Sequence, residues 1–317
     1  MNTYDLTEVY GVGNVKLLQN NHYLPMGFMT NSALASWQVD ENEDQFNPFD
    51  KQNEFFKLAT GIKNDVYTPL DVVSQGHTDY NQFPVNKTGY GRYSFSCTDT
   101  TVTPHVKWNY EAPKDGLYLM YADISGGDDV TVMINDVAQS KTYGMGRSYI
   151  ACIGQCKKGD KISVYSNLQQ GQSGSAMVFV DVLNQDVFEE GYNKLSKSVM
   201  TTTKLTGSSM EGTINAQENG LFYTSVPYEE GWKAYVDGKE VKITPVGNAL
   251  VAFNLAKGEH TIKLEYYPKG FAIGLTVTII CAATFAFLCV WTYIIKKRRK
   301  KKGDISENPE EVQINAE

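Results

Sequence analysis

Histidine and cysteine are scarce in this chain of 317 residues, which contains 4 of the former and 5 of the latter. The histidines form no H-x-x-x-H or H-E-x-x-H pattern, and no G-x-S-x-G sequence is present. Only Cys97, Cys152 and Cys156 lie outside the apolar run described below, too few for a disulfide framework. They are interpreted as buried structural residues, or as one bridge with a thiol left over. We expect no metal ion, no cofactor and no catalytic site in this chain.

A basic face is also lacking. The first 295 residues contain 22 of the 29 Lys and Arg residues and 31 of the 36 Asp and Glu residues, which gives them a net charge of −9. Because a nucleic-acid-binding protein needs a basic face, we expect no nucleic-acid partner. The remaining cations form one block near the C-terminus: Lys296, Lys297, Arg298, Arg299, Lys300, Lys301 and Lys302.

Charge is absent from residues 271–295, just before this cationic block. A helix of that length is about 37 Å long and can cross a hydrocarbon core of about 30 Å. Trp291 and Tyr293 lie near its end, where aromatic side chains favour the membrane interface. The sequence therefore predicts a transmembrane helix over 270–295, with the lipid bilayer as partner. By the positive-inside rule the cationic block is topogenic, the tail 296–317 is cytoplasmic and the body is extracytoplasmic.

An export signal is not visible, although this topology requires 270 residues to cross the membrane. The first residues, MNTYDLTEVYGVGNV, have neither a basic nor an apolar signal-peptide region. One alternative is a tail-anchored protein whose body stays inside the cell. The other is the C-terminal part of a longer polytopic protein, whose upstream helices would be partners of this chain. We favour the second, because the tail after the helix is long and highly charged for a tail anchor.

Short β-type runs bounded by Gly, Asp and Asn fill most of the body, as in GLYLMYADI and DKISVYS, and later in GLFYTSVPY and HTIKLEYY. Two helices interrupt them. Asn47 as N-cap and Gly61 as terminator predict a helix at about 48–60. Phe188, Tyr192 and Leu195 have helical spacing and predict a linking helix within 186–198.

The β-type runs before and after this linking helix resemble each other. Three pairs of segments align at offsets of about 100 residues: 112–121 with 216–225, 130–140 with 232–242, and 156–166 with 255–266. In the middle pair, Asn135 and Asp136 align with Val236 and Asp237. Such a repeat suits a small antiparallel sandwich. We predict a mainly β fold with two antiparallel, jelly-roll-like β-sandwich modules, at 72–185 and 199–268, after an N-terminal segment 1–71 that could add a strand to either.

Aromatic side chains are plentiful, with 20 Tyr and 14 Phe residues. On strands they usually pack in the core or against a neighbouring strand. The less common alternative is a platform on which sugar rings stack. The candidates for sugar contact are Trp108, Tyr110, Trp232 and Tyr235.

Several stretches resemble the bacterial YfhO family, most clearly PYEEGWKAYVDGKEVKITPVGNALVAFNLAKGEHTIKLEYYPKGFAIGL (227–275), together with LPMGF (24–28), NPFDKQNEFFKLATG (47–61) and DVFEEGYNKLS. These are large polytopic membrane proteins, regarded as glycosyltransferases that use lipid-linked sugars and decorate cell-envelope polymers such as lipoteichoic acid. In such proteins the catalytic acid lies near the N-terminus, so no catalytic residue carries over to this chain.

The resemblance implies that this chain is the non-catalytic extracytoplasmic β-sandwich region and last membrane helix of such an enzyme. Its expected partners are the upstream transmembrane helices and a glycan or teichoic-acid polymer. The alternative is a stand-alone, membrane-anchored carbohydrate-binding or adhesion module.

Overall fold

The computed structural model describes residues 6–13, 15–39, 46–77, 84–97, 101, 104–143 and 149–303. The fold is mainly β, with 49% of residues in strands and 22% in helices, as the sequence predicts. The chain forms two compact units. The first comprises Met1–Tyr228 and Ala234–Leu264, and the second comprises Glu229–Lys233 and Glu265–Glu317.

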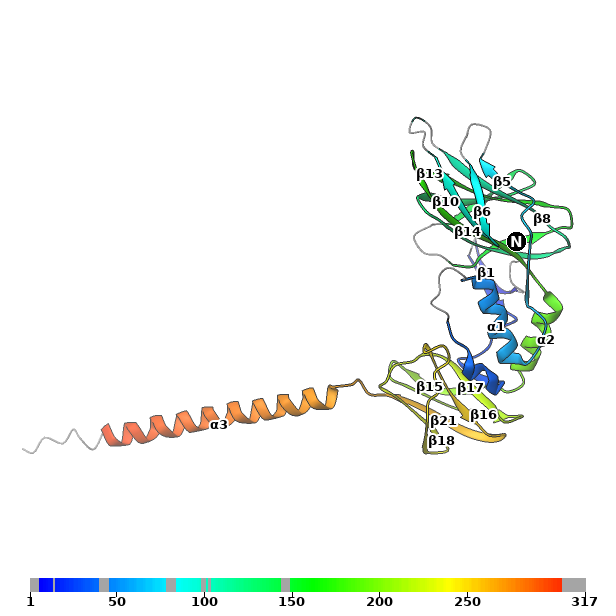
Figure 1. Ribbon diagram of the computed structural model, residues 1–317. Coiled ribbons are helices and arrows are strands. Elements are labelled where there is room, and N and C mark those ends of the chain that lie inside the picture. Colours follow the sequence, from blue (N-terminus) through cyan, green and yellow to red (C-terminus); the bar gives the residue numbers. More distant parts are fainter. Residues whose placement is uncertain are drawn as a thin grey trace, which may run out of the picture. The chain divides into compact units, whose positions relative to one another are not determined.

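The first β-module consists of two antiparallel sheets (Figure 1). One sheet has the order β11 (Val137–Tyr143), β10 (Gly127–Ile134), β13 (Lys161–Leu168), β8 (His105–Glu111) and β5 (Ser74–His77). The other has the order β12 (Ala151–Cys156), β9 (Gly116–Ile124), β14 (Ser173–Leu183), β7 (Arg92–Ser96) and β6 (Val85–Gly89), with β4 (Tyr67–Pro69) paired to β14. Both sheets contribute to one core, for example through Trp108 and Val164 of one and Tyr118 and Val180 of the other. This arrangement is a β-sandwich.

The second β-module is smaller and also has two sheets. The first has the order β15 (Thr201–Thr206), β16 (Ser209–Ala216), β21 (Gly258–Tyr266), β18 (Trp232–Val236) and β19 (Lys239–Val241). The second has the order β20 (Leu250–Leu255), β17 (Gly220–Pro227) and β3 (Gly27–Thr30). Ile262 and Leu264 alternate with more exposed residues along β21 and are fully buried. This alternation is typical of a strand with one face on a core.

The strand orders of the two modules correspond. The order β11-β10-β13-β8-β5 matches β19-β18-β21-β16-β15, and β12-β9-β14 matches β20-β17-β3. Topology therefore supports the duplication that the sequence predicts, except that β3 lies before the other strands of its module in the chain, whereas β14 lies after them.

The turns of the two modules correct the predicted alignment by one residue. Asn135 and Asp237 both have a φ of 51°. The Oδ1 atom of Asn135 accepts a hydrogen bond from the amide of Lys161, and that of Asp237 accepts one from the amide of Thr261, each at 2.9 Å. Asn135 therefore corresponds to Asp237, and not to Val236.

The N-terminal segment contributes to both modules. Strand β4 pairs with β14 of the first module, whereas β3 pairs with β17 of the second, with Thr30 opposite Leu221. The second module is therefore not confined to residues 199–268. Sequence patterns leave this assignment open, because a strand's periodicity does not reveal its distant partner.

Helix α1 (Pro48–Thr60) begins and ends as predicted. The side chain of Asn47 accepts a hydrogen bond from the amide of Phe49 at 3.1 Å, and Gly61 ends the helix with a φ of 72°. Phe49 packs on β9 and β14 of the first module, while Ala59 belongs to the cluster formed with β17 and β20 of the second. Helix α1 thus covers the corresponding outer sheet face in both copies.

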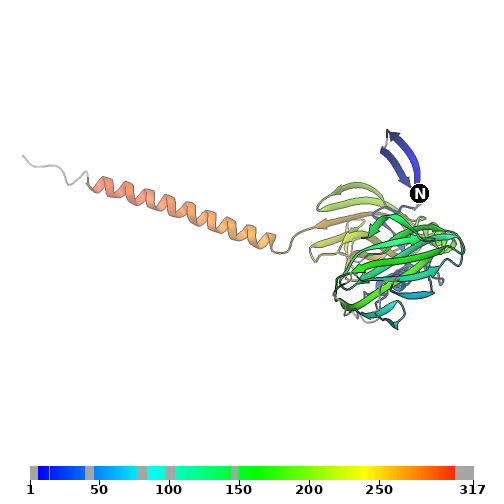
Figure 2. The same cartoon turned by 90° about the horizontal axis from the view of Figure 1, so that it is seen from above.

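Helix α2 (Gln185–Leu195) connects the two modules and lies against α1 (Figure 1). A short 3-10 helix, η1 (Ser32–Ser36), lies beside α1 and β17. Strands β1 (Leu6–Val12) and β2 (Val15–Asn20) form a separate two-stranded sheet, drawn in dark blue in Figure 2.

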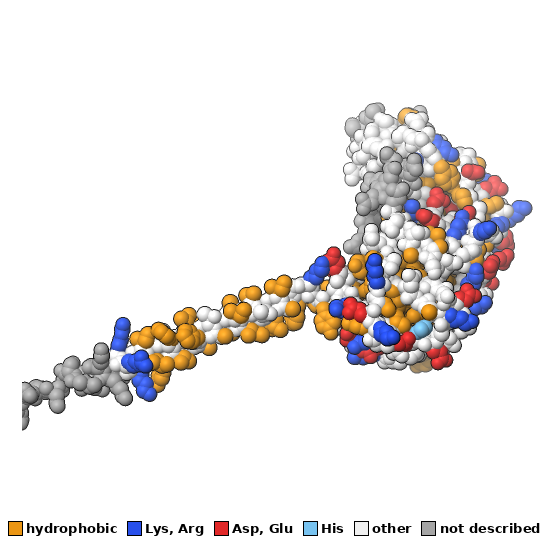
Figure 3. Space-filling model, turned by 60° about the horizontal axis from the view of Figure 1, so that its bottom comes forward, with side chains coloured by type: hydrophobic (Ala, Val, Ile, Leu, Met, Phe, Trp, Pro, Cys, Tyr) orange, Lys and Arg blue, Asp and Glu red, His pale blue; other side chains and the backbone are white. Residues whose placement is uncertain are grey.

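The second unit contains helix α3 (Phe271–Gly303), which continues from the predicted transmembrane segment into the cationic block. Residues Phe271–Arg299 are long and apolar enough to cross a membrane, with a mean hydropathy of 2.4 in the most apolar stretch. In the view of Figure 3, hydrophobic side chains cover the length of this helix, and cationic side chains lie at its far end. The side chains of Lys300, Lys301 and Lys302 and residues 304–317 lie outside the described part of the structure.

Candidate functional site

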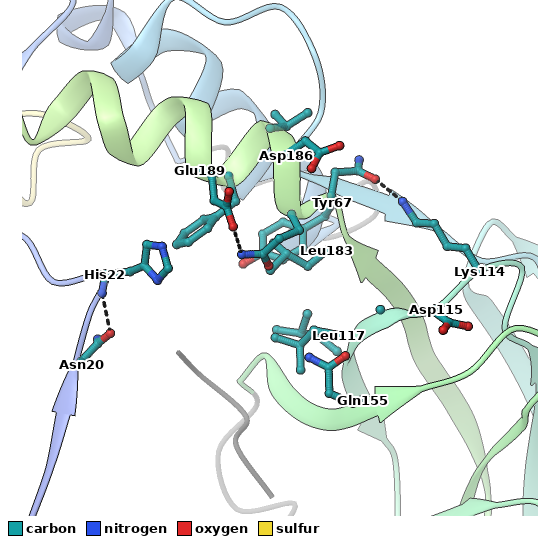
Figure 4. Close-up of a pocket in the computed structure, with 16 residues that line it drawn as sticks. Asn20, His22, Tyr67, Lys114, Asp115, Leu117, Gln155, Leu183, Asp186 and Glu189 are labelled. Atoms are coloured by element: carbon teal, nitrogen blue, oxygen red, sulfur yellow. Dashed lines mark hydrogen bonds between the residues drawn. The ribbon is translucent and has the colours of Figure 1, made fainter. Parts of the chain in front are cut away.

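A groove of about 1090 Å³ lies in the first unit, beside the N-terminus of α2 (Figure 4). Its floor is apolar and is formed by Leu117 and Leu119 of β9, Leu183 of β14 and Tyr67 of β4. These residues belong to the outer face of the sheet, which packs on Phe49 of α1. The run GLYLMYADI is therefore apolar on both faces of β9, because one face meets the core and the other meets α1 and the groove.

One rim of the groove is the first turn of α2. Asn184 occupies the N-cap position, but its side chain does not cap the helix. Instead its Oδ1 atom accepts a hydrogen bond from Lys114 Nζ at 2.7 Å, and its Nδ2 atom donates to the Asp65 carbonyl and to Thr68 Oγ1. The Lys114 ammonium is thereby held beside the helix N-terminus, where the backbone amides point outward.

A second rim is formed by Asp115 and Gln155. Asp115 Oδ2 lies 2.8 Å from Lys157 Nζ, and its Oδ1 accepts the amide of Lys158 at 2.9 Å. These hydrogen bonds lower the pKa of Asp115, so the group is a carboxylate at neutral pH. Gln155 of β12 lies opposite Leu117 in the sheet and extends beside it in Figure 4.

The third wall is the base of the β1–β2 hairpin. The ring of His22 stands edge-on to Phe188 and to Tyr192, with centroid distances of 5.2 and 4.8 Å. The hydroxyl of Tyr192 donates to the carbonyl of Asn21 at 3.1 Å. The end of β2 is therefore fixed on α2, and Asn20 and His22 close this side of the groove.

This combination suits a ligand with apolar faces and many hydroxyl groups. Leucine and tyrosine side chains offer a floor, while the rim offers an ammonium, an amide and carboxylates. Small-molecule sites typically combine an apolar lining with a few polar groups that fix orientation. Among the described residues, no three His, Cys, Asp or Glu side chains are grouped so that they could hold a metal ion.

The second module differs at the place that corresponds to the floor of the groove. In the second module Leu221 corresponds to Leu117 and is fully buried, in a cluster with Leu34 of η1 and Ala59 of α1. The 3-10 helix and α1 therefore occupy the place that stays open in the first module. Sequence reasoning missed the groove, because its residues come from several distant segments, each with an ordinary pattern.

The predicted sugar-contact residues lie elsewhere. Trp108 is 0% exposed and Tyr110 is 3% exposed, both in the core of the first module. The ring of Trp108 lies 5.4 Å from that of Tyr93, and the Tyr110 hydroxyl donates to the Val178 carbonyl. Neither ring presents a face to solvent, so a sugar cannot stack on them in this fold. Both side chains instead pack in the core, which is the usual role of aromatic residues on strands.

Trp232 and Tyr235 lie on β18 and are half-buried. The ring of Trp232 is 5.2 Å from that of Tyr266, in a tilted arrangement typical of packed aromatic pairs. Neither residue lines the groove.

The cysteines of the body form no disulfide bond with one another. Cys97 and Cys156 are buried, and Cys152 is partly exposed. Burial raises the pKa of the Cys156 thiol to about 11, which keeps it protonated and unreactive. The structure agrees with the interpretation as structural cysteines, and it does not contain the one bridge that was the alternative.

A buried carboxyl lies under α1, on the outer face of β14. Asp181 is 1% exposed, and its Oδ1 atom has no hydrogen-bond partner among the described residues. Burial, together with the nearby charge of Asp50, raises the pKa of Asp181 to about 7. Asp181 could not be recognised from the sequence, because it interrupts an otherwise apolar run, VFVDVL, without any motif around it.

Solved structures with a similar arrangement include a cycloisomaltooligosaccharide glucanotransferase from Paenibacillus sp., with 8% identity and a TM-score of 0.20 over 60% of this chain and 45% of that chain. Another is a GH2 beta-galacturonidase from Eisenbergiella tayi, with 9% identity and a TM-score of 0.23 over 63% of this chain and 38% of that chain. At these values the likeness carries no argument about function.

Sequence comparison is more informative. The "Uncharacterized protein YfhO" of Bacillus subtilis (strain 168) is 29% identical over an alignment of 136 residues, and the match covers 39% of this chain and 14% of that protein. This chain thus matches only a small part of the length of its relative. The model of the family described as "Bacterial membrane protein YfhO" matches residues 1–278. Together with the apolar helix α3, this match over most of the chain shows that the protein belongs to the bacterial membrane protein YfhO family.

Proposed function

We propose that this chain is the non-catalytic, extracytoplasmic region and membrane anchor of a YfhO-type membrane glycosyltransferase that acts on cell-envelope polymers of the lipoteichoic-acid type. In this proposal the groove beside α2 holds a sugar chain, and α3 keeps the two β-modules at the membrane surface. The observation that carries the proposal is the groove itself, with its apolar floor and polar rim.

The shape and chemistry of the groove support a saccharide ligand. A sugar ring has one or two apolar faces of C–H groups, which fit Leu117 and Tyr67 on the floor. Its hydroxyls are both donors and acceptors, which suits the amide of Gln155 and the carboxylate of Asp115. The groove is open to solvent, so a polymer can pass along it without threading an end.

The duplicated fold provides a matched control for the binding test. Gln155 lies opposite Leu117 in β12 and β9, and Asn254 lies opposite Leu221 at the corresponding place in β20 and β17. Both are exposed amide side chains, but only Gln155 lines the groove. Gln155→Ala and Asn254→Ala therefore remove the same chemistry from corresponding positions.

The experiment measures binding of the full chain, reconstituted in lipid nanodiscs, to an array of bacterial envelope glycans and teichoic acids. We expect Gln155→Ala to weaken binding by about tenfold, the loss of one or two hydrogen bonds, and Asn254→Ala to leave it unchanged. If the wild-type chain binds no polymer on the array, or if both variants weaken binding equally, the groove is not a sugar site.

Orientation has its own test. The cations Lys296, Lys297, Arg298 and Arg299 follow the apolar part of α3, and the positive-inside rule places them in the cytoplasm. In intact cells, a thiol-reactive reagent that does not cross membranes should label Ser208→Cys, in the turn between β15 and β16. Labelling only after the membrane is opened would show that the body lies inside the cell.

A stand-alone adhesion module would also bind glycans. The two functions differ in the cell, because an accessory region affects glycosylation and an adhesion module does not. If Gln155→Ala abolishes glycan binding while the sugar content of envelope polymers is unchanged, the adhesion function replaces the proposed one.

A further inference from the structure

The β1–β2 hairpin is a largely uncovered β structure in the first unit. It pairs with no other described strand, and every residue of β2 is exposed. Figure 2 shows it standing apart from the sheets of both modules. A two-stranded hairpin is marginally stable in water on its own. Its base, however, is fixed on α2 through His22 and Asn21.

The register of the hairpin places four of its large apolar residues on one face. Tyr10 lies opposite Leu17, and Val12 lies opposite Val15, so these four side chains share a face. Their exposed fractions are 64%, 61%, 61% and 74%, in the order named. An exposed cluster of this kind marks a contact surface.

The opposite face is mixed. Lys16 Nζ lies 2.7 Å from Glu8 Oε2, so the two charges of this face neutralise each other. Leu18 and Val9 add further exposed apolar surface, at 47% and 57%. The hairpin is thus amphipathic, with Tyr10, Val12, Val15 and Leu17 forming what we call the apolar hairpin face.

Three features indicate what covers the apolar hairpin face. The hairpin has fewer residues than the roughly 20–30 per partner in a standard interface between separate proteins, which disfavours a second copy. It has no unpaired cation to attract an anionic lipid surface. Its outer strand edges need hydrogen-bond partners, which a bilayer core cannot provide. A further strand from a polypeptide provides both the apolar cover and the hydrogen bonds.

Family membership indicates the source of that strand. The Bacillus relative matches this chain over only 14% of its own length, so the family includes polypeptide well beyond the matched region. A contact with a tethered segment needs less buried area than one between free proteins, because tethering raises the effective concentration. We propose that the β1–β2 hairpin is the docking surface for an apolar, β-forming segment of a YfhO-family polypeptide that lies outside residues 1–317.

In this arrangement the segment pairs with a free edge of the hairpin and packs on Tyr10 and Leu17. The hairpin then becomes part of a larger sheet, fixed on α2 at one end. This proposal is independent of the sugar-binding role of the groove, since neither residue lines it.

The test places a photoreactive amino acid on the hairpin in the bacterium's own membrane. The protein is expressed from its native locus with p-benzoylphenylalanine in place of Leu17, or of Lys16 on the opposite face as control. After irradiation, cross-linked peptides are identified by mass spectrometry. We expect position 17 to yield a YfhO-family peptide from outside residues 1–317, at several times the yield from position 16.

Every other product overturns the proposal: a lipid adduct, a peptide from a second copy of residues 1–317, a peptide of an unrelated protein, or no product at all. Leu17→Asp gives a second readout. It should leave thermal unfolding of the purified full chain unchanged, because Leu17 is exposed there, and should abolish a cross-link formed from position 10. Glycan binding is measured on the same Leu17→Asp variant. If the cross-link is lost while glycan binding is unchanged, docking has failed and the groove is intact.

Discussion

His260 Nδ1 lies 2.8 Å from Asp237 Oδ2, and this pair joins the turn between β18 and β19 to strand β21. At the corresponding place in the first module, Asn135 Nδ2 donates to Asp160 Oδ1 at 2.9 Å. The geometry of the turn is thus the same in both copies, while the chemistry of the pair has changed from amide and carboxylate to imidazole and carboxylate. Each pair contains a carboxylate whose pKa is lowered by the partner side chain, Asp160 in the first copy and Asp237 in the second, so both contacts weaken in acid.

Replacing His260 should lower the free energy of unfolding at pH 7 and make that free energy depend less on pH in the acid range. The hydrogen bond from His260 lowers the pKa of Asp237. A carboxyl whose pKa is lowered by folding stabilises the fold above its unfolded pKa of about 4, and this stability is lost as the pH falls through the folded pKa. We expect His260→Ala to cost roughly 1 kcal/mol or less at pH 7, because the pair is partly exposed.

The measurement is chemical unfolding of the full chain at pH 7 and at pH 2. Asn135→Ala is the matched comparison: the Asn135 side chain lowers the pKa of Asp160 in the first module, so the loss in this variant should also shrink in acid. A His260→Ala penalty of the same size at both pH values would show that the pair contributes no pH dependence.

Asp181→Asn should stabilise the protein at alkaline pH. Burial raises the pKa of Asp181 to about 7, whereas an unfolded Asp has a pKa of about 4. Below pH 4 the group is protonated in both states and costs nothing. Between pH 4 and 7 the unfolded state loses its proton first, so stability falls, by up to about 4 kcal/mol above pH 7. The Asp181→Asn variant has no ionisable group at this position, so its stability does not fall in this way as the pH rises.

Unfolding by denaturant at pH 4.5 and pH 8 checks this expectation. The gain from Asp181→Asn should be larger at pH 8, and the exposed-site control Glu190→Gln should show no such difference. An equal effect at both pH values would mean that Asp181 is already ionised at low pH in the folded protein.

Gly191→Ala should weaken the contact between α1 and α2. A Cβ atom at position 191 would overlap the ring of Phe56. Overpacking of this kind costs about 1–3 kcal/mol, more than the roughly 0.5–1 kcal/mol that alanine gains over glycine within a helix.

Thermal unfolding of the full chain measures the effect. Phe56→Leu should restore part of the stability in the Gly191→Ala background, and Gly207→Ala, where a Cβ meets nothing within 4 Å, should be neutral. Gly191→Ala without any loss of stability would show that Phe56 moves aside at little cost.

Phe285→Arg should impair membrane insertion. Phe285 lies in the middle of the apolar part of α3, where an arginine costs about 2.5–3.5 kcal/mol on insertion scales. Extraction of membranes with alkaline carbonate should release more of this variant than of the wild type. The conservative change Phe285→Leu should behave as wild type. Equal retention of all three would argue against α3 as a spanning helix.

Local signals in the sequence were sufficient to predict the elements whose contacts are local. The cap residues Asn47 and Gly61 define both ends of α1, and the apolar length of 271–295 defines α3. The repeat of about 100 residues also follows from local patterns. The predicted alignment of the repeat was displaced by one residue at Asn135. Sequence similarity alone does not show which residue of a turn adopts a positive φ.

Long-range relationships could not be derived in the same way. Nothing in GFMT at 27–30 indicates that it pairs with Leu221, and nothing distinguishes the core-facing ring of Trp108 from an exposed one before the sheets are assembled. The groove likewise depends on distant segments. Its floor includes outward-facing residues of β9, and among the described residues no counterpart of η1 covers them.

The pairing of β3 with β17 has a consequence for the synthesis and the proteolysis of the protein. Thr30 and Leu221 are separated by 191 positions, which a ribosome adds in roughly 10–40 s. All strands of the first module are synthesised within that interval, while β3 waits for its neighbour. A single proteolytic cut anywhere between these strands leaves one sheet of the second module in two pieces of chain, so the two copies, though built alike, cannot be released from each other by one cleavage.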